Sequence, residues 1–114
     1  MPSSKTLLFA MKSGLAGIAI LAAGVATTAV AEVSQETVDK GEALYNQTCS
    51  VCHQADAIGK PGFAPSLTNQ ELLAIASNKF LMSTVRDGRL GTGMPPFSYL
   101  GKDKIKAIVA FLRA

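Results

Sequence analysis

Apolar residues recur at helical spacing in several segments after residue 33. The clearest is residues 102–113, where Ile105, Ile108, Val109 and Leu112 form one apolar stripe of the kind that an amphipathic helix buries. Weaker patterns of the same period predict further helices over residues 34–48, from about 68 to 76, and from 78 to 88. No segment alternates apolar and polar residues like a half-buried strand, so the chain is predicted to be all-α.

Polar residues and helix breakers indicate where these helices begin and end. Ser34 is placed to cap the first helix, and Thr68 or Asn69 the second. Glycine and proline are concentrated in residues 59–65 and 91–97. Both segments are therefore predicted to be loops rather than helices or central strands.

Gly41 lies in the middle of the first predicted helix, where glycine costs about 1 kcal/mol relative to alanine. Close approach of another helix is the reason that we expect for it. Tyr45 and Cys49 follow at intervals of one turn, so the three residues share one face of the helix.

The N-terminal segment has the pattern of an export signal. Two lysines precede an uncharged apolar run over residues 15–26, and Ala-Val-Ala at 29–31 fits a cleavage site for small residues. We therefore expect a signal peptide over residues 1–31, a mature domain over residues 32–114, and a periplasmic location. The alternative is an uncleaved anchor that faces the periplasm, because the uncharged run is nearly long enough to span a bilayer.

Charge is divided unevenly along the expected mature chain. Residues 32–59 carry five acidic residues and one basic residue, whereas residues 60–114 carry eight basic and three acidic residues. The basic half is expected to dock on an acidic protein surface. Nucleic acid is not an expected partner, because the basic residues are not clustered with interleaved aromatic residues.

The strongest chemical motif is C-x-x-C-H, formed by Cys49, Cys52 and His53. This run is the attachment signal for c-type haem. A structural zinc site needs four ligands, whereas the chain has two cysteines and one histidine in all. A redox dithiol would call for a βαβ pattern that is not found here, and a plain disulfide would leave the adjacent histidine unexplained. We therefore predict one covalent haem c, attached through Cys49 and Cys52 and ligated by His53.

The sixth ligand of such a haem cannot be a second histidine of this chain, because His53 is the only one. Met94 is favoured, since the glycines and prolines around it would display it on a rigid loop. Met82 is the alternative, although it lies in a helical pattern where methionine more often fills the core. An open sixth position is the remaining possibility.

The order and spacing of these features resemble those of a small bacterial class I cytochrome c, over essentially all of residues 32–114. In that family a glycine and an aromatic residue precede the first haem cysteine, and an aliphatic and an aromatic residue lie on the helix that crosses there. A proline and a leucine follow the haem histidine, and the axial methionine comes later. The matching residues here are Gly41, Tyr45, Cys49, Ile108, Phe111, Pro65, Leu67 and Met94.

The resemblance implies a class I cytochrome c fold, in which the N- and C-terminal helices cross while short middle helices and loops surround one haem. It implies that the carbonyl of Pro65 accepts a hydrogen bond from His53, and that Leu67 packs on the porphyrin. Contacts to the haem propionates do not carry over, because the chain lacks tryptophan and its middle region is short. Arg89 and Thr92 are the candidates for that role.

These expectations indicate a periplasmic electron carrier rather than an enzyme, present as a monomer or a small subunit. Its partners would be redox proteins: a membrane oxidase or reductase, or a periplasmic dehydrogenase. The alternative is the haem-carrying subunit of a periplasmic dehydrogenase or sulfur-oxidising complex. A haem enzyme with an open iron is the third possibility, against which Met94 argues. Contact with a membrane is expected only if the N-terminal segment is not cleaved.

Overall fold

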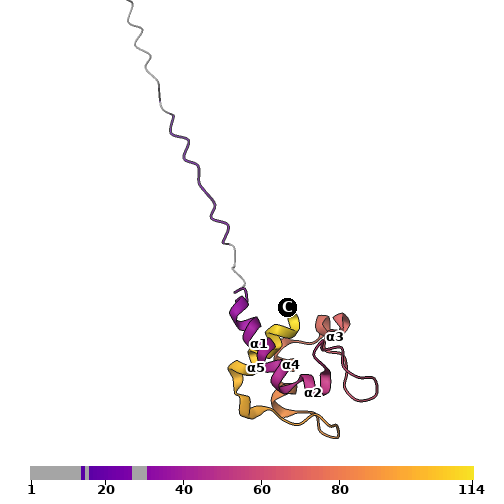
Figure 1. The fold of residues 1–114 in the computed structure, drawn as a ribbon. Coiled ribbons are helices and arrows are strands. Elements are labelled where there is room, and N and C mark those ends of the chain that lie inside the picture. The colour runs from indigo at the N-terminus through magenta and orange to yellow at the C-terminus, as the bar shows by residue number, and fades with distance from the viewer. Residues whose placement is uncertain (1–13, 15, 27–30) are drawn as a thin grey trace, which may run out of the picture.

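The computed structural model describes residues 14, 16–26 and 31–114 (Figure 1). Most of the predicted signal peptide, including residues 27–30 at the expected cleavage site, lies outside the described residues, and its cleavage stays a prediction. Within the described ranges, no helix combines the length and the apolar character that crossing a bilayer would require.

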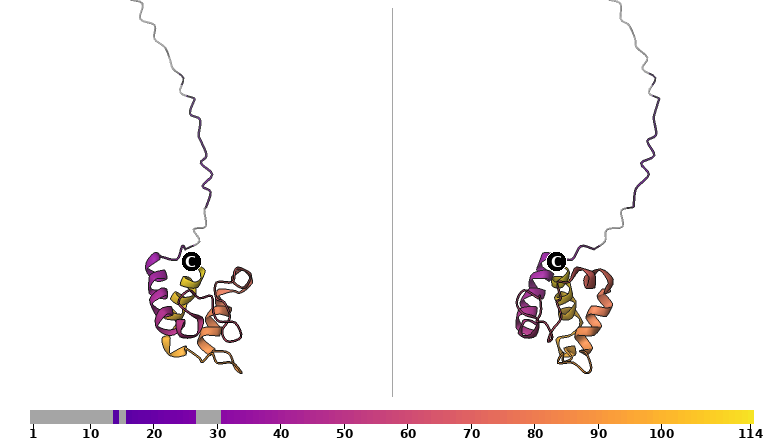
Figure 2. Two further views of the ribbon diagram at one scale, coloured as in Figure 1. Left: turned by 45° about the vertical axis from the view of Figure 1, so that its right-hand side comes forward. Right: turned by 90° about the vertical axis from the view of Figure 1, so that its right-hand side faces the viewer.

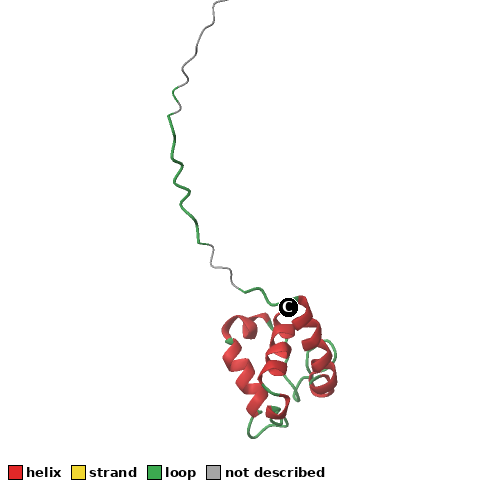
Figure 3. Ribbon diagram, turned by 90° about the vertical axis from the view of Figure 1, so that its left-hand side faces the viewer, coloured by secondary structure: helices red, strands yellow, loops and turns green. Residues whose placement is uncertain are grey.

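Residues 31–114 form short helices joined by loops, which Figure 3 shows in red and green. In this part of the chain, extended structure is limited to an isolated bridge between Lys60 and Ala64. The prediction of an all-α domain is therefore confirmed. The elements are α1 (Gln35–Thr48), α2 (Ser50–His53), α3 (Gln70–Ile75), α4 (Asn78–Asp87), the 3-10 helix η1 (Ser98–Leu100) and α5 (Lys102–Arg113).

Side-chain caps explain where three of the helices begin. Ser34 caps α1 as predicted, and its hydroxyl accepts a hydrogen bond of 3.3 Å from an amide in the first turn. At α3 the cap is Asn69 rather than Thr68, because the Asn69 side chain accepts from two first-turn amides at 2.9 and 3.2 Å. Ser77 caps α4 in the same way, at 3.0 Å. Each cap satisfies backbone donors that the helix itself leaves unpaired.

Helices α1 and α5 pack directly against each other, as both views of Figure 2 show in magenta and yellow. At their contact, a Cβ atom on Gly41 would lie 1.9 Å from the carbonyl oxygen of Ala107 and 2.9 Å from the Cβ of Phe111. No side chain fits in that space. The predicted reason for Gly41, close approach of another helix, is thus confirmed.

The core of the domain gathers around this crossing. Tyr45 is 0% exposed and Ile108 is 1% exposed. The ring of Tyr45 lies 5.4 Å from that of Phe111, centroid to centroid, in a tilted arrangement. The hydroxyl of Tyr45 donates a 2.6 Å hydrogen bond to the carbonyl of Gln54, directly after α2. This bond ties α1 to the segment that carries His53.

Arg113, the last residue of α5, forms hydrogen bonds with the end of α3 and the start of α4. Its guanidinium donates to the carbonyl of Leu73 at 2.7 Å, and also to the carbonyl of Ala76 and the side chain of Asn78. These carbonyls end α3, where the helix leaves acceptors without a helical partner. The end of α5 therefore holds α3 and the start of α4 in place.

Candidate cofactor-binding site

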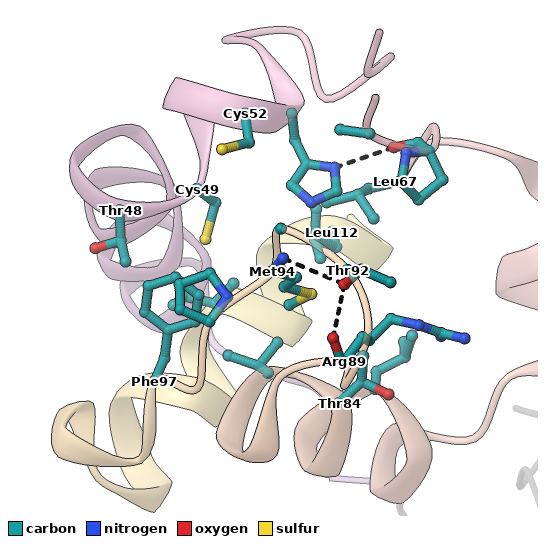
Figure 4. Close-up of a pocket in the computed structure, with 18 of the residues that line it drawn as sticks. Thr48, Cys49, Cys52, Leu67, Thr84, Arg89, Thr92, Met94, Phe97 and Leu112 are labelled. Carbon is teal, nitrogen blue, oxygen red and sulfur yellow. Dashed lines mark hydrogen bonds between the residues drawn. The ribbon is translucent and has the colours of Figure 1, made fainter. Parts of the chain in front are cut away.

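A cavity of about 500 Å³ lies among α2, α4, α5 and the two long loops. Most of its wall is apolar, and the close-up in Figure 4 shows the side chains around it. All six residues that the sequence predicts to bind a cofactor line it: Cys49, Cys52, His53, Pro65, Leu67 and Met94. The structure thus brings together residues that lie as many as 45 positions apart in the chain.

Cys49 and Cys52 are placed by the junction of α1 and α2. Both are free thiols and both are half-buried. Figure 4 shows their sulfur atoms on the same side of the cavity. Burial, with a smaller contribution from Cys52, raises the pKa of the Cys49 thiol to about 11. Catalytic redox dithiols have a lowered pKa, so this pair is unlike a thioredoxin-type centre.

His53 ends α2 and is buried against the loop that follows. Its Nδ1 lies 3.0 Å from the carbonyl oxygen of Pro65. Because a carbonyl oxygen can only accept, Nδ1 donates this hydrogen bond, and the lone pair of the neutral ring is on Nε2. Within the described residues, Nε2 has no hydrogen-bond partner. A histidine held in this way is suited to bind a metal through Nε2.

The loop that carries Pro65 is held by its own backbone. The amide of Gly59 donates to the carbonyl of His53 at 3.0 Å, and the amide of Leu67 donates to that of Ala57 at 2.8 Å. Gly59 has a φ of +81°, and a Cβ atom there would lie 2.5 Å from the carbonyl oxygen of Pro65. Glycine is therefore required at this position for the loop to close over His53.

Met94 lies in the cavity wall, on a loop whose ends are joined by hydrogen bonds. The amide of Arg89 donates to the carbonyl of Met94 at 3.2 Å. The hydroxyl of Thr92 donates to the carbonyl of Arg89 at 2.7 Å and accepts from the amide of Met94 at 3.2 Å. Met82, the alternative ligand, is not among the residues that line the cavity.

Helices α4 and α5 supply a part of the wall that the sequence analysis did not assign to a site. Their apolar residues were recognised by helical spacing, which does not tell a side chain that packs on protein from one that packs on a ligand. The residues from these helices that line the cavity are Phe80, Leu81, Thr84, Val85, Ile108, Val109 and Leu112.

The residues present fit a haem c. The cavity has the volume and the apolar wall of a typical cofactor site. It presents two neighbouring thiols, one imidazole with its Nδ1 already bonded, and one thioether. In the part of the chain that the structure describes, no three His, Cys, Asp or Glu side chains form a group that could hold a metal ion directly.

Comparison with known proteins gives an independent result. A family model described as cytochrome C oxidase, cbb3-type, subunit III, matches residues 36–112. The chain is 40% identical over 58 residues to the Cbb3-type cytochrome c oxidase subunit CcoP of Rubrivivax gelatinosus. That match covers 51% of this chain and 18% of the relative, so the chain spans less than a fifth of the relative's length.

Solved structures of c-type cytochromes are similar to this fold. Cytochrome CL from the methylotrophic bacterium Methylophaga aminisulfidivorans matches with a TM-score of 0.58 and 30% identity, over 71% of this chain and 54% of that one. The c-type cytochrome NirC matches with a TM-score of 0.55 and 27% identity, over 70% of this chain and 92% of that one. These similarities confirm the predicted class I cytochrome c fold.

Proposed function

The chain belongs to the cytochrome c family described as cytochrome C oxidase, cbb3-type, subunit III, and we propose that it carries single electrons between redox proteins in the periplasm, with His53 and Met94 as the axial ligands of its haem. Proteins of this family carry haem c covalently and transfer electrons, which confirms the predicted cofactor. When bound, haem c supplies a one-electron couple whose potential depends on the axial ligands.

The observation that supports this proposal best is that one cavity collects every group that a His/Met haem c needs. Cys49 and Cys52 would hold the haem through thioether bonds on one side of that cavity. The bond from His53 to Pro65 leaves Nε2 as the nitrogen for the iron. Met94 would supply its sulfur from the opposite loop, and Leu67 would pack on the porphyrin.

The remaining lining residues make the cavity largely apolar. Apolar side chains from α4 and α5 form part of the wall, and they would keep water away from the two ligands. If His53 and Met94 both bind the iron, a substrate would have no position at the metal. This arrangement suits an electron carrier rather than an enzyme.

Substitution of Met94 by alanine tests the proposal. We expect the Met94→Ala protein to lose the far-red sulfur–iron charge-transfer band of the oxidised state, to have a lower reduction potential, and to bind carbon monoxide. The matched control is Met82→Ala, because Met82 lies outside the cavity lining and should keep all three properties. Loss of the band in the control, with its retention in Met94→Ala, would identify Met82 as the ligand instead.

A second candidate function is that of a haem-carrying component of a larger oxidoreductase. The family and the matched relative are both described as oxidase subunits. In addition, three apolar side chains are largely exposed: Phe63, which lines the cavity, and Val51 and Leu90, which adjoin lining residues in the sequence. Purification of the native protein under mild conditions separates the candidates. A stoichiometric partner supports the subunit, and a free monohaem protein supports the shuttle.

The proposed periplasmic location has its own test. Cell fractionation combined with the intact mass should give a haemoprotein that begins after Ala31 and is found in the periplasmic fraction. A membrane-bound protein whose mass includes residues 1–31 would instead indicate the anchored form.

A further inference from the structure

Arg89 differs from the other residues around the cavity in its charge. Among the lining residues that the structure describes, it is the one arginine, and no lysine, aspartate or glutamate lines the cavity with it. Its guanidinium makes no hydrogen bond or ion pair with any described residue, whereas Arg86, three residues earlier, is paired with Asp87 at 2.7 Å. Arg89 is an exposed residue, so it brings a full positive charge and a set of free donors to the edge of a largely apolar cavity.

The hydroxyl groups beside Arg89 are already used by the protein. Thr84 donates its proton to the carbonyl of Phe80 at 2.9 Å. Thr92 donates its proton to the carbonyl of Arg89 at 2.7 Å, and its oxygen accepts from the amide of Met94. A hydroxyl has only one proton to donate. Neither threonine can therefore donate to a ligand without giving up a bond that holds its own segment.

The position of Arg89 relative to the cysteines gives the direction in which a haem would lie. In Figure 4 the sulfur atoms of Cys49 and Cys52 are on one side of the cavity, and Arg89 is on the other, beside Thr84. On a porphyrin of the haem type, the two carbons that bond to cysteine lie at the edge opposite the two propionates. A haem attached at the cysteines would thus direct its carboxylates toward the side where Arg89 lies.

We propose that Arg89 binds a propionate carboxylate of the haem, and that Thr92 does not. Guanidinium and carboxylate form strong, often bidentate hydrogen bonds, and Arg89 supplies the free donors on that side of the cavity. The inference rests on the proposed function, because it needs a haem attached at Cys49 and Cys52. The sequence analysis named both Arg89 and Thr92 as candidates to contact the propionates. In this proposal only Arg89 binds a propionate, whereas Thr92 holds the loop of Met94 through its hydrogen bonds.

The positive charge of Arg89 should affect the reduction potential of the haem. A cation held beside the haem opposes the extra positive charge of the oxidised iron, so Arg89 should raise the reduction potential. The amide of Arg89 is bonded to the carbonyl of Met94 at 3.2 Å. One short loop would thus hold both the sixth ligand and the carboxylate.

The test compares Arg89→Gln with Arg86→Gln in the holoprotein. Both changes remove one positive charge from neighbouring positions, but Arg86 is paired with Asp87 and lies outside the cavity lining. We expect Arg89→Gln to shift the propionate bending band in the resonance Raman spectrum and to lower the reduction potential. Arg86→Gln should leave the band in place and change the potential less.

A third variant, Arg89→Lys, separates charge from geometry. It should recover most of the potential, since the charge is kept, while the Raman band stays shifted because an ammonium cannot reproduce the planar fork of a guanidinium. If Arg89→Gln does not accumulate as a folded protein, the band of Arg89→Lys decides the question. An unshifted band in whichever of these variants folds would overturn the assignment.

The proposed function and this inference fail in different ways. Wild-type protein that carries no haem on Cys49 and Cys52, measured by intact mass, would remove the proposed function. Wild-type protein with haem attached, together with an Arg89→Gln variant whose band and potential match those of Arg86→Gln, would remove only the role of Arg89.

Discussion

The two sides of this small domain are built in different ways. On one side, α1 and α5 pack protein against protein, with Gly41 in contact with the backbone of Ala107 and with Tyr45 fully buried. On the other side, α4 and the segment that carries Met94 face a cavity of about 500 Å³. Val85 is the only residue of α4 that the protein alone buries.

The difference shows which part of the core the protein supplies itself. The helix crossing is complete without a cofactor, because its side chains already fill the space between the helices. The opposite wall has apolar side chains whose packing partner would be the haem. A chain of this size gains only about 3–5 kcal/mol from an apolar core. The cofactor is therefore expected to be part of the folded structure as well as the redox centre.

The largest expected effect comes from preventing attachment of the haem, with the double variant Cys49→Ala/Cys52→Ala purified without haem. Without the haem, the apolar wall of the cavity would face water or collapse, and a domain of this size has only about 3–5 kcal/mol from its own apolar core to offset that cost. We expect some helical circular dichroism from α1 and α5, but no cooperative thermal transition. Ser50→Ala, on the same short helix but outside the lining, should unfold like the wild type. A double variant with the midpoint of the holoprotein would contradict this comparison.

The second-largest effect on stability is expected from Gly41→Ala, at the contact between α1 and α5. Helix propensity alone favours alanine by about 1 kcal/mol. The added Cβ would meet the Ala107 carbonyl oxygen at 1.9 Å, however, and such overpacking costs about 3 kcal/mol. We therefore expect a net loss of about 2 kcal/mol in the free energy of unfolding, measured with denaturant on the holoprotein.

The control for Gly41→Ala is the reverse exchange at Ala43, an exposed position of the same helix. Ala43→Gly should cost only the propensity term of about 1 kcal/mol. If Gly41→Ala were instead more stable than the wild type, the two helices could not be in close contact at this point.

A smaller effect is expected from Tyr45→Phe, which removes the 2.6 Å hydrogen bond from the Tyr45 hydroxyl to the carbonyl of Gln54. The loss should be about 1–2 kcal/mol in the free energy of unfolding, because the part-buried hydrogen bond is lost and the carbonyl of Gln54 is left without this partner. Tyr99→Phe is the control, since Tyr99 is 74% exposed and should change stability by less than about 0.5 kcal/mol. Equal effects at the two positions would mean that the bond contributes nothing.

The smallest effect is confined to alkaline solution. Burial, with smaller contributions from Cys49 and Asp56, raises the pKa of Tyr45 to about 12, from 10 in the unfolded chain. The folded state thus binds this proton more tightly, so its contribution to stability is complete below pH 10 and is lost as the pH rises from 10 to 12. Unfolding curves across this range should fall more steeply for the wild type than for Tyr45→Phe. Parallel curves would show that Tyr45 does not titrate in this way.

The elements of the fold could be read from local features of the sequence. The stripe from Ile105 to Leu112 predicted α5, and Ser34 marked the start of α1, because helix periodicity and capping depend on residues a few positions apart. The choice between Thr68 and Asn69 could not be made in this way, since both side chains can cap a helix. The cap is Asn69 because the amides of the first turn of α3 point at its side chain and not at that of Thr68.

The sequence predicted the cofactor and its ligands, but not all of the residues that line the cavity. The C-x-x-C-H run indicates a haem from residues that are adjacent in the chain, and Met94 was favoured over Met82 because glycines and prolines surround it. Helical spacing could not show that Phe80 and Leu81 face the cavity, because apolar residues have the same pattern whether they pack on protein or on a ligand.

The sequence by itself determined the order of the helices, the haem motif and the need for a close helix contact at Gly41. The tertiary structure alone decided which side chains meet across the chain. In the folded chain the Nδ1 of His53 donates to the carbonyl of Pro65, and the hydroxyl of Thr92 donates to the carbonyl of Arg89. The guanidinium of Arg89 has no hydrogen-bond partner among the described residues. The physical reason is that a hydrogen bond is set by the positions of two groups in space, and segments far apart in sequence take those positions only when the whole chain packs.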